Sequence, residues 1–215
     1  MMRTLQTTLA WVAEGTDLCR KAVSDLDEAS YSAPSSLPGW TRKHVVAHVA
    51  ANARALRNLM HWARTGEPTP MYSSPEQRLA DIESGARLPA AWLTAWFEES
   101  AQLLAYAMSE LTEKQWRAEV LTAQGRTVPA SEVPWMRTRE VMVHAVDLNT
   151  GVQFVDLPEE FCAELRHDIF GKRGSDSVPG VQGGNADITA YLAGRPYTGV
   201  TTGDGSPAEP LTPWL

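Results

Sequence analysis

A glutamate and a histidine at helical spacing are the residues best suited to chemistry. Glu140 and His144 lie in residues 135–149, a stretch that follows Pro134 and contains neither Gly nor Pro. On a helix, residues four apart lie one above the other on the same face. A carboxylate and an imidazole arranged in this way can bind one divalent cation. Two ligands do not complete a metal site, so a third has to come from elsewhere in the chain.

His48 is the candidate for that third ligand. It lies in an Ala- and Val-rich helical stretch, with Val45 and Val49 nearby. A polar imidazole on such a face needs a hydrogen-bond partner or a metal. A core histidine that is simply hydrogen-bonded is the common alternative. His44, one turn earlier, competes for the role, but its place in the first turn predicts a surface position or one behind a ligand.

The pair on the second stretch also has a simpler interpretation. Acid–histidine pairs four residues apart are often surface contacts that stabilise a helix by a few tenths of a kcal/mol. The apolar neighbours Val141, Met142, Val143 and Val146 argue against full exposure. Asp147 could orient an imidazole through a hydrogen bond or could be a solvated acid. If His48, Glu140 and His144 do meet, they leave coordination positions open, which is typical of catalytic zinc.

Composition excludes several classes of protein. The 215 residues carry a formal net charge of −7, with 43% hydrophobic and 21% charged residues, which is ordinary for a globular protein. An acidic chain without an evident basic stripe is not expected to bind nucleic acid. Cys19 and Cys162 lack metal-ligand spacing and are expected to be buried, reduced thiols. No signal peptide or membrane span is apparent, so we expect a cytoplasmic protein.

The apolar periodicity predicts a mainly α fold, an up-and-down four-helix bundle. Thr41 and Ser74-Pro75 are helix start signals, and Gly66 is a stop signal. A helical stretch from Ser74 is interrupted near Gly85 and Pro89. Strand-like pieces at 120–122 and 126–128 flank Gln124-Gly125. The four main helices are expected at 4–29, 41–63, 90–111 and 134–150.

The sequence pattern changes after Gly151, where shorter elements and a Gly- and Ser-rich stretch follow the long helical ones. A fifth helix is expected from Leu157-Pro158, a Gly- and Ser-rich loop at 171–184, a short helix at 185–193 and a strand at 200–202. A boundary near residue 155 divides the chain into a helical bundle, 1–155, and a small α/β domain, 156–215.

Several stretches resemble a known family. Residues 37–50 are similar to the second-helix motif of the DinB-like metalloproteins. Within that superfamily, four stretches resemble the mycothiol-dependent maleylpyruvate isomerases. They are residues 58–63, 69–72, 120–132 and 135–148. The resemblance covers most of residues 37–150. It implies a four-helix bundle that binds a divalent metal, usually zinc, through His48, Glu140 and His144.

The C-terminal part is less similar to the family. Residues 193–195, Ala-Gly-Arg, resemble a segment whose arginine faces the family's active site, and the closing Pro-Trp-Leu is similar too. The stretch before Asn185 looks abbreviated. The resemblance implies that this domain helps to bind a low-molecular-weight thiol and the substrate. Arg78 also stands at a position resembling a family active-site arginine, and Arg126 lies in a strongly matching loop.

The family reaction converts maleylpyruvate into fumarylpyruvate, as in gentisate-type aromatic degradation. Rotation about a carbon–carbon double bond requires that the bond become single for a time. A thiolate adds to the conjugated alkene, the bond rotates, and the thiol leaves. Since neither cysteine lies near the metal motifs, the thiolate is expected from an external thiol, mycothiol by default or ergothioneine. The metal could acidify the thiol or polarise the substrate carbonyl.

Arginines suit a dicarboxylate substrate because their planar forks match carboxylates. The resemblance implies that Arg195 and Arg78 are candidate catalytic residues, and that Arg126 and Arg195 are candidate thiol-binding residues. Two other functions stay open: a metal-dependent thiol S-transferase acting on electrophiles, and a non-enzymatic metal- or ligand-binding regulator. We expect a monomer or a weak homo-oligomer whose partners are small molecules.

Overall fold

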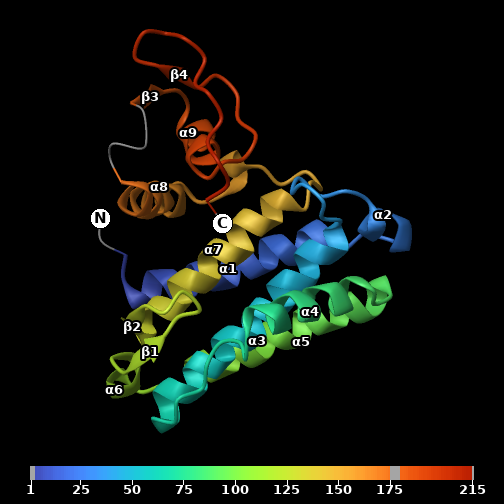
Figure 1. Ribbon diagram of the computed structural model, residues 1–215, viewed down its shortest axis with the longest axis vertical. Coiled ribbons are helices and arrows are strands. Elements are labelled where there is room, and N and C mark those ends of the chain that lie inside the picture. Colours follow the sequence, from blue (N-terminus) through green and yellow to red (C-terminus); the bar gives the residue numbers. More distant parts are fainter. Residues whose placement is uncertain (1–2, 175–179, 215) are drawn as a thin grey trace. The chain divides into compact units, whose positions relative to one another are not determined.

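The computed structural model describes residues 3–174 and 180–214 and is built mainly of helices (Figure 1). The elements in chain order are α1 (Leu5–Val23), α2 (Glu28–Ser32), α3 (Arg42–Thr65), α4 (Pro75–Ala86), α5 (Ala90–Ser109), α6 (Glu113–Trp116), β1 (Glu119–Leu121), β2 (Thr127–Pro129), η1 (Ala130–Glu132), α7 (Val133–Asp147), η2 (Phe154–Asp156), α8 (Glu159–Arg173), β3 (Val181–Gln182), α9 (Asn185–Leu192) and β4 (Thr201–Thr202). Contacts group the chain into two compact units, 4–151 and 152–215, the second together with 1–3. The mainly α class expected from the sequence is confirmed.

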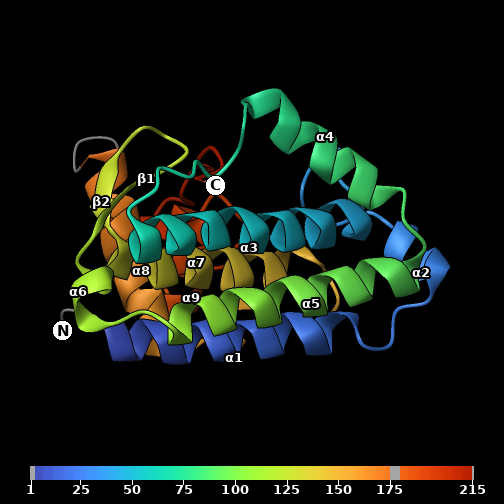
Figure 2. The same cartoon turned by 90° about the horizontal axis from the view of Figure 1, so that it is seen from below.

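Four long helices form the first unit, as the apolar periodicity predicts. Helix α1 packs against α7, and α3 packs against both α5 and α7. In Figure 2, α1 and α7 run in one direction and α3 and α5 in the other. Helix α4 carries the chain back between α3 and α5, which is why these two are parallel. Helices α3 and α7 are consequently antiparallel neighbours.

Two glycines allow helices to approach closely within this unit. A Cβ atom on Gly15 of α1 would lie 2.5 Å from Cγ2 of Val141 in α7. A Cβ atom on Gly85 of α4 would lie 2.7 Å from Cβ of Ala47 in α3. Real Cβ atoms do not approach so closely, because protein interiors are already close-packed. Both contacts lie beside the stretches that carry the candidate ligands.

Helix α3 begins and ends where the sequence predicts. The backbone N–H of Thr41 donates to Nδ1 of His44 at 3.2 Å, which caps the first turn. Gly66 follows the last turn with a φ of 80°, a left-handed conformation that glycine adopts without steric cost. The start signal at Ser74 is confirmed as well, since its hydroxyl accepts from the backbone N–H of Gln77.

Several helix ends differ from the sequence prediction, and two of them have a local cause. The helix expected over 4–29 ends at Val23, and Asp27 caps a separate helix by accepting from the N–H of Ser30 at 2.8 Å. The side chain of Asp27 thus competes with the backbone for hydrogen bonds, which ends a helix. The helix expected to reach residue 150 ends at Asp147, and Asn149 is left-handed, with a φ of 53°.

The expected strand pieces pair as an antiparallel hairpin, with Val120 opposite Val128. Both valines are buried in a core cluster. The cluster is formed mainly by α3, α5 and the hairpin, and its largest members include Leu56, Leu59, Met60, Leu104, Met108 and Trp116. The hairpin therefore closes one end of the bundle.

The second unit contains α8 packed against α9 and the antiparallel pair β3–β4. Helix α8 continues to Arg173, so the expected loop over 171–184 begins later than predicted. Residues 175–179 of that loop and Leu215 lie outside the described residues. Arg3 belongs to this unit and forms an ion pair with Glu164 at 2.6 Å.

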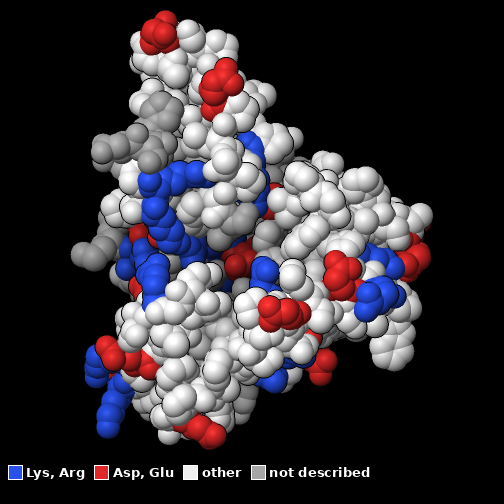
Figure 3. All heavy atoms as spheres, viewed as in Figure 1, with Lys and Arg blue, Asp and Glu red and all other residues white. Residues whose placement is uncertain are grey.

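Both signs of charge are present on the surface. Figure 3 shows Lys and Arg as well as Asp and Glu side chains on one face of the molecule. Acidic residues outnumber basic ones over the whole chain, which gives the net charge of −7. Over the described part of the chain, no helix combines the length and the apolar character needed to cross a membrane.

Candidate metal centre

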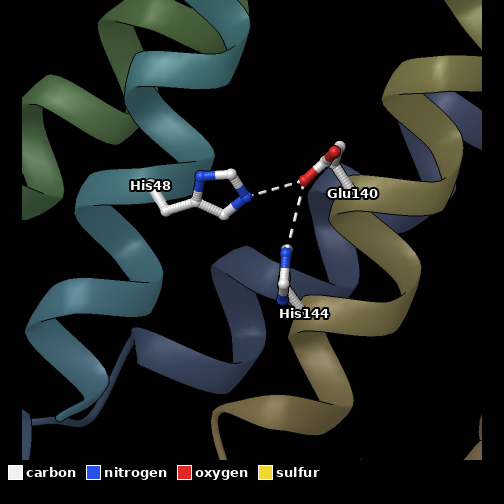
Figure 4. Close-up of side chains that lie close together, drawn as sticks. All are labelled: His48, Glu140 and His144. Atoms are coloured by element: carbon white, nitrogen blue, oxygen red, sulfur yellow. Dashed lines mark hydrogen bonds and ion pairs between the residues drawn. The ribbon is translucent and has the colours of Figure 1, made fainter. Parts of the chain in front are cut away.

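Helix α3 places His48 in the interior of the bundle. Its flanking residues Ala47 and Val49 are buried, and His48 itself is 5% exposed. The indole of Trp40, in the loop before α3, lies edge-on to the imidazole at a centroid distance of 5.7 Å. Only the Nε2 side of the ring is directed at α7 (Figure 4). The competing candidate, His44, instead caps the start of α3 with its Nδ1.

Helix α7 supplies two side chains that face His48. Glu140 and His144 project from successive turns toward α3, as Figure 4 shows. Oε2 of Glu140 lies 2.8 Å from Nε2 of His48 and 3.3 Å from Nε2 of His144. The two imidazoles stand nearly perpendicular, with ring centroids 4.8 Å apart. The sequence-predicted triad therefore meets at one point between two antiparallel helices.

Asp147 hydrogen-bonds to the ring nitrogen of His144 that does not face Glu140. Its Oδ2 lies 2.8 Å from Nδ1 of His144, and its side chain is fully buried. A buried carboxylate can only accept, so Nδ1 carries the proton and donates it. Nε2 is then directed at Glu140 and His48. The sequence left open whether Asp147 orients an imidazole or is a solvated acid. The geometry supports the first, because Asp147 is buried and hydrogen-bonded to His144.

Burial and charge together shift the pKa values of the triad. Burial alone would raise the pKa of Glu140, but His48 and His144 outweigh it and hold that pKa well below its ordinary range. Burial lowers the pKa of His48 despite the nearby carboxylate. Burial opposes the charged form of His144 too, but hydrogen bonds to Asp147 and Glu140 raise its pKa to about 9. At neutral pH the metal-free cluster holds an anionic Glu140 and a cationic His144.

The donor set fits a divalent metal ion such as zinc. Two imidazole nitrogens and a carboxylate oxygen are common zinc ligands, with bonds of about 2.0–2.1 Å, so tetrahedral neighbours lie about 3.3 Å apart. The three candidate ligand atoms all lie within 4.8 Å of one another. Small side-chain movements would place them around one ion. Three protein ligands leave at least one position for a reacting group.

Comparison with known proteins gives a family. Residues 12–149 match the family described as the mycothiol maleylpyruvate isomerase N-terminal domain, which is more than half of the chain. The chain belongs to this family.

Two solved structures are similar to the whole chain. They are the crystal structure of the mycothiol-dependent maleylpyruvate isomerase and that of a mutant of it in which one histidine is replaced by alanine. Each is 42% identical, covers 97% of both chains and gives a TM-score of 0.92. No curated protein matches the chain. The alignment covers nearly the full length of both chains, so it includes the C-terminal region as well as the residues of the family match.

Arg78 of this family member lies beside the triad. From α4, its Nη2 lies 3.5 Å from Nδ1 of His48, on the side of the ring opposite Glu140. Arg78 also hydrogen-bonds to the hydroxyl of Tyr72. Burial raises the pKa of Tyr72, and the nearby charge of Glu140 adds to this effect. A guanidinium and a phenol thus border the cluster.

The other two candidate arginines are described by their contacts within their own units. Arg126 is exposed in the turn between β1 and β2, where its backbone N–H donates to Oγ1 of Thr122 at 3.2 Å. Arg195 belongs to the second unit, where it is 5% exposed and donates from Nη1 to the carbonyl of Ala193 at 2.9 Å. The roles of both toward thiol and substrate stay predictions.

Arg137 and Asn52 are buried beside the triad and were not singled out from the sequence. Asn52 follows His48 by four residues, and Arg137 precedes Glu140 by three, so each shares a helix face with a ligand. This spacing was the signal that could have identified them.

Proposed function

We propose that this chain is a metal- and thiol-dependent cis–trans isomerase that converts maleylpyruvate to fumarylpyruvate with mycothiol. One observation carries the proposal. His48, Glu140 and His144 converge on one point in a chain 42% identical, over 97% of its length, to a mycothiol-dependent maleylpyruvate isomerase. A metal ion bound there would act as a Lewis acid on the thiol or the substrate carbonyl, and the bound thiol would supply the attacking thiolate.

The protein's own residues hold and orient these groups. His48, Glu140 and His144 are proposed to bind the metal, and Asp147 fixes the tautomer of His144 through Nδ1. Arg78 stands close enough to the triad to pair with a substrate carboxylate, because its Nη2 already lies beside His48. Its planar fork suits that anion.

Two arginines outside the triad complete the proposal. We assign Arg195 to the binding of both substrate and thiol, and Arg126 to the binding of the thiol. Both assignments rest on the family resemblance of their segments.

The setting of the reaction is proposed as the cytoplasm. Cys19 and Cys162 are free thiols, as expected in a reducing compartment. We propose that the chain works as a monomer or a weak homo-oligomer, which sedimentation at several concentrations tests.

The test is an assay of maleylpyruvate with purified mycothiol, with ergothioneine and with no thiol, each with and without a metal chelator. Isomerisation is expected with mycothiol only, and chelation should abolish it. Glu140→Gln keeps the shape of the side chain but weakens the metal site, so it should lower kcat by roughly 10²–10³-fold. The exposed Glu99→Gln removes a charge of the same sign from the surface and should change nothing.

Product analysis separates isomerisation from the two alternatives. Isomerisation leaves the mass of the substrate unchanged. A stable thioether detected by mass spectrometry would instead indicate an S-transferase. Zinc binding without turnover of any tested alkene would indicate a regulator. Activity that survives complete removal of the metal would contradict the proposed mechanism.

A further inference from the structure

Arg137 joins the two ligand-bearing helices from inside the bundle. It is 1% exposed, and its Nη1 donates to the carbonyl of Val49 at 2.7 Å and to Oδ1 of Asn52 at 3.0 Å. Val49 directly follows His48 in α3, and Arg137 precedes Glu140 by one turn in α7. One guanidinium therefore spans the interface next to ligands on both sides.

Helix packing alone does not require this arrangement. Removing a guanidinium from water is costly, and apolar side chains often pack such an interface at no loss of stability. Burial lowers the pKa of Arg137 to about 10, so the group is still a cation at neutral pH. Its Nη2 is buried without a hydrogen-bond partner among the described residues. A buried charge that is incompletely satisfied points to a role other than stability.

The metal site requires a fixed register between α3 and α7. A helix rises 1.5 Å per residue, whereas metal–ligand distances tolerate deviations of only about 0.2 Å. A slip of one residue would move His48 away from Glu140 and His144 by several times that tolerance. A directional hydrogen bond to a backbone carbonyl resists such a slip better than apolar contacts, which are not directional.

A second arginine joins the same helices farther from the ligands. Arg42, at the start of α3, donates from Nε to the carbonyl of Leu148 and from Nη2 to that of Asn149, each at 2.8 Å. Its bonds lie past the C-terminal end of α7, and its side chain is not fully buried. Arg42 thus offers a control of the same residue type that also donates to backbone carbonyls, those of Leu148, Asn149 and, from Nη1, Ser30.

We propose that Arg137 is a positioning residue for the metal centre, whose bonds to Val49 and Asn52 hold His48 at the distance from Glu140 and His144 that a metal ion requires. The inference rests on the metal site of the proposed function. It concerns residues outside the group of three candidate metal ligands.

The role of Arg137 is tested by two measurements. Zinc titration against a chromogenic chelator gives the zinc affinity, and thermal unfolding of the metal-free chain gives its stability. The variant Arg137→Met/Asn52→Leu removes both polar partners together, which is the least disruptive way to delete a buried pair. The carbonyl of Val49 keeps its ordinary helical hydrogen bond. We expect zinc affinity to fall about 10–100-fold while the metal-free unfolding temperature stays near that of the unmodified chain. Asn52→Ala alone should weaken zinc binding in the same direction by a smaller factor.

Arg42→Met supplies the comparison. It should lower the unfolding temperature while changing zinc affinity less than threefold. The proposal would be overturned if Arg137→Met/Asn52→Leu bound zinc as tightly as the unmodified chain. If the double variant does not fold, the same result in Asn52→Ala would overturn it. Equal losses of affinity in the Arg137 and Arg42 variants would overturn it too, because general helix packing would then set the site.

The readout is independent of turnover. A chain that binds zinc as described but does not isomerise maleylpyruvate would contradict the proposed function and leave the role of Arg137 standing. Conversely, an active enzyme whose zinc affinity is indifferent to Arg137 would overturn only this inference.

Discussion

Nδ1 of His144 donates a hydrogen bond to the fully buried carboxylate of Asp147, with the two atoms 2.8 Å apart. The contact spans three residues within the last turn of α7. It fixes the imidazole so that Nε2 faces Glu140 and His48. An acid with no access to solvent thus controls a ligand that has to meet the metal.

The variant Asp147→Asn tests this control. Asn preserves the shape but removes the charge that favours an Nδ1 proton, so zinc affinity should fall about 10–100-fold. Equilibrium competition with a chelator measures the change. Glu99→Gln, on the exposed face of α5, is the control for loss of one negative charge. Zinc binding equal to that of the unmodified chain would show that Asp147 does not set the orientation of His144.

Zinc binding should release a proton. The metal-free His144 has a pKa of about 9, above its ordinary value of 6.5, so at pH 7 its imidazole is protonated and a metal has to displace that proton. His48, with its pKa lowered, is already neutral there. Apparent zinc affinity is therefore expected to rise about tenfold per pH unit until roughly pH 9, where the competition ends.

Calorimetry in buffers of different ionisation enthalpy counts the released protons. About one proton per zinc is expected at pH 7 and fewer than half a proton above pH 9.5. Proton release of zero at pH 7 would mean that His144 is neutral in the metal-free chain. The same raised pKa stabilises the metal-free fold below pH 6.5, and this contribution is lost as the pH rises through about 9.

Neither cysteine should serve as the attacking thiol. Sγ of Cys19 donates to the carbonyl of Val141 at 3.0 Å, and burial raises the pKa of this thiol to about 12. Burial raises the pKa of Cys162 to about 11. At pH 8 the thiolate fractions are about 10⁻⁴ and 10⁻³, so alkylation of the folded chain by iodoacetamide should be negligible. Cys19→Ala and Cys162→Ala should keep mycothiol-dependent turnover, and loss of turnover in a folded variant would implicate a protein thiol.

Arg195 should affect turnover but not metal content. Loss of a charge-assisted pairing with a carboxylate in Arg195→Ala is expected to lower kcat/KM for maleylpyruvate about 10–100-fold. Zinc measured by atomic absorption should stay at one per chain. Unchanged kinetics would remove Arg195 from the proposed site.

Arg166→Ala is the matched control for that variant. Arg166 also lies in the second unit, where it donates to Oγ1 of Thr189 at 2.8 Å and pairs with Glu159. Its loss should lower stability without changing kcat/KM. A similar kinetic loss in both variants would point to general damage to the unit.

Local signals in the sequence determined much of the fold. The spacing of Glu140 and His144 fixes them on one helix face whatever surrounds them, because helical periodicity is a property of the backbone. The cap at Ser74 and the hairpin around Gly125 are equally local. Where the predicted helix ends were wrong, side chains hold backbone groups that a longer helix would have paired. Asp27 accepts from the N–H of Ser30, and Arg42 donates to the carbonyls of Leu148 and Asn149.

The meeting of the two helices was decided by tertiary structure. That His48 rather than His44 faces Glu140 depends on the register of α3 against α7, which no local pattern in either segment encodes. The burial of Arg137 depends on the same packing, since only a neighbouring helix can supply the carbonyl of Val49. The sequence alone determined which side chains could bind a metal, and only the packing of two distant helices decided that their ligand atoms come within reach of one ion.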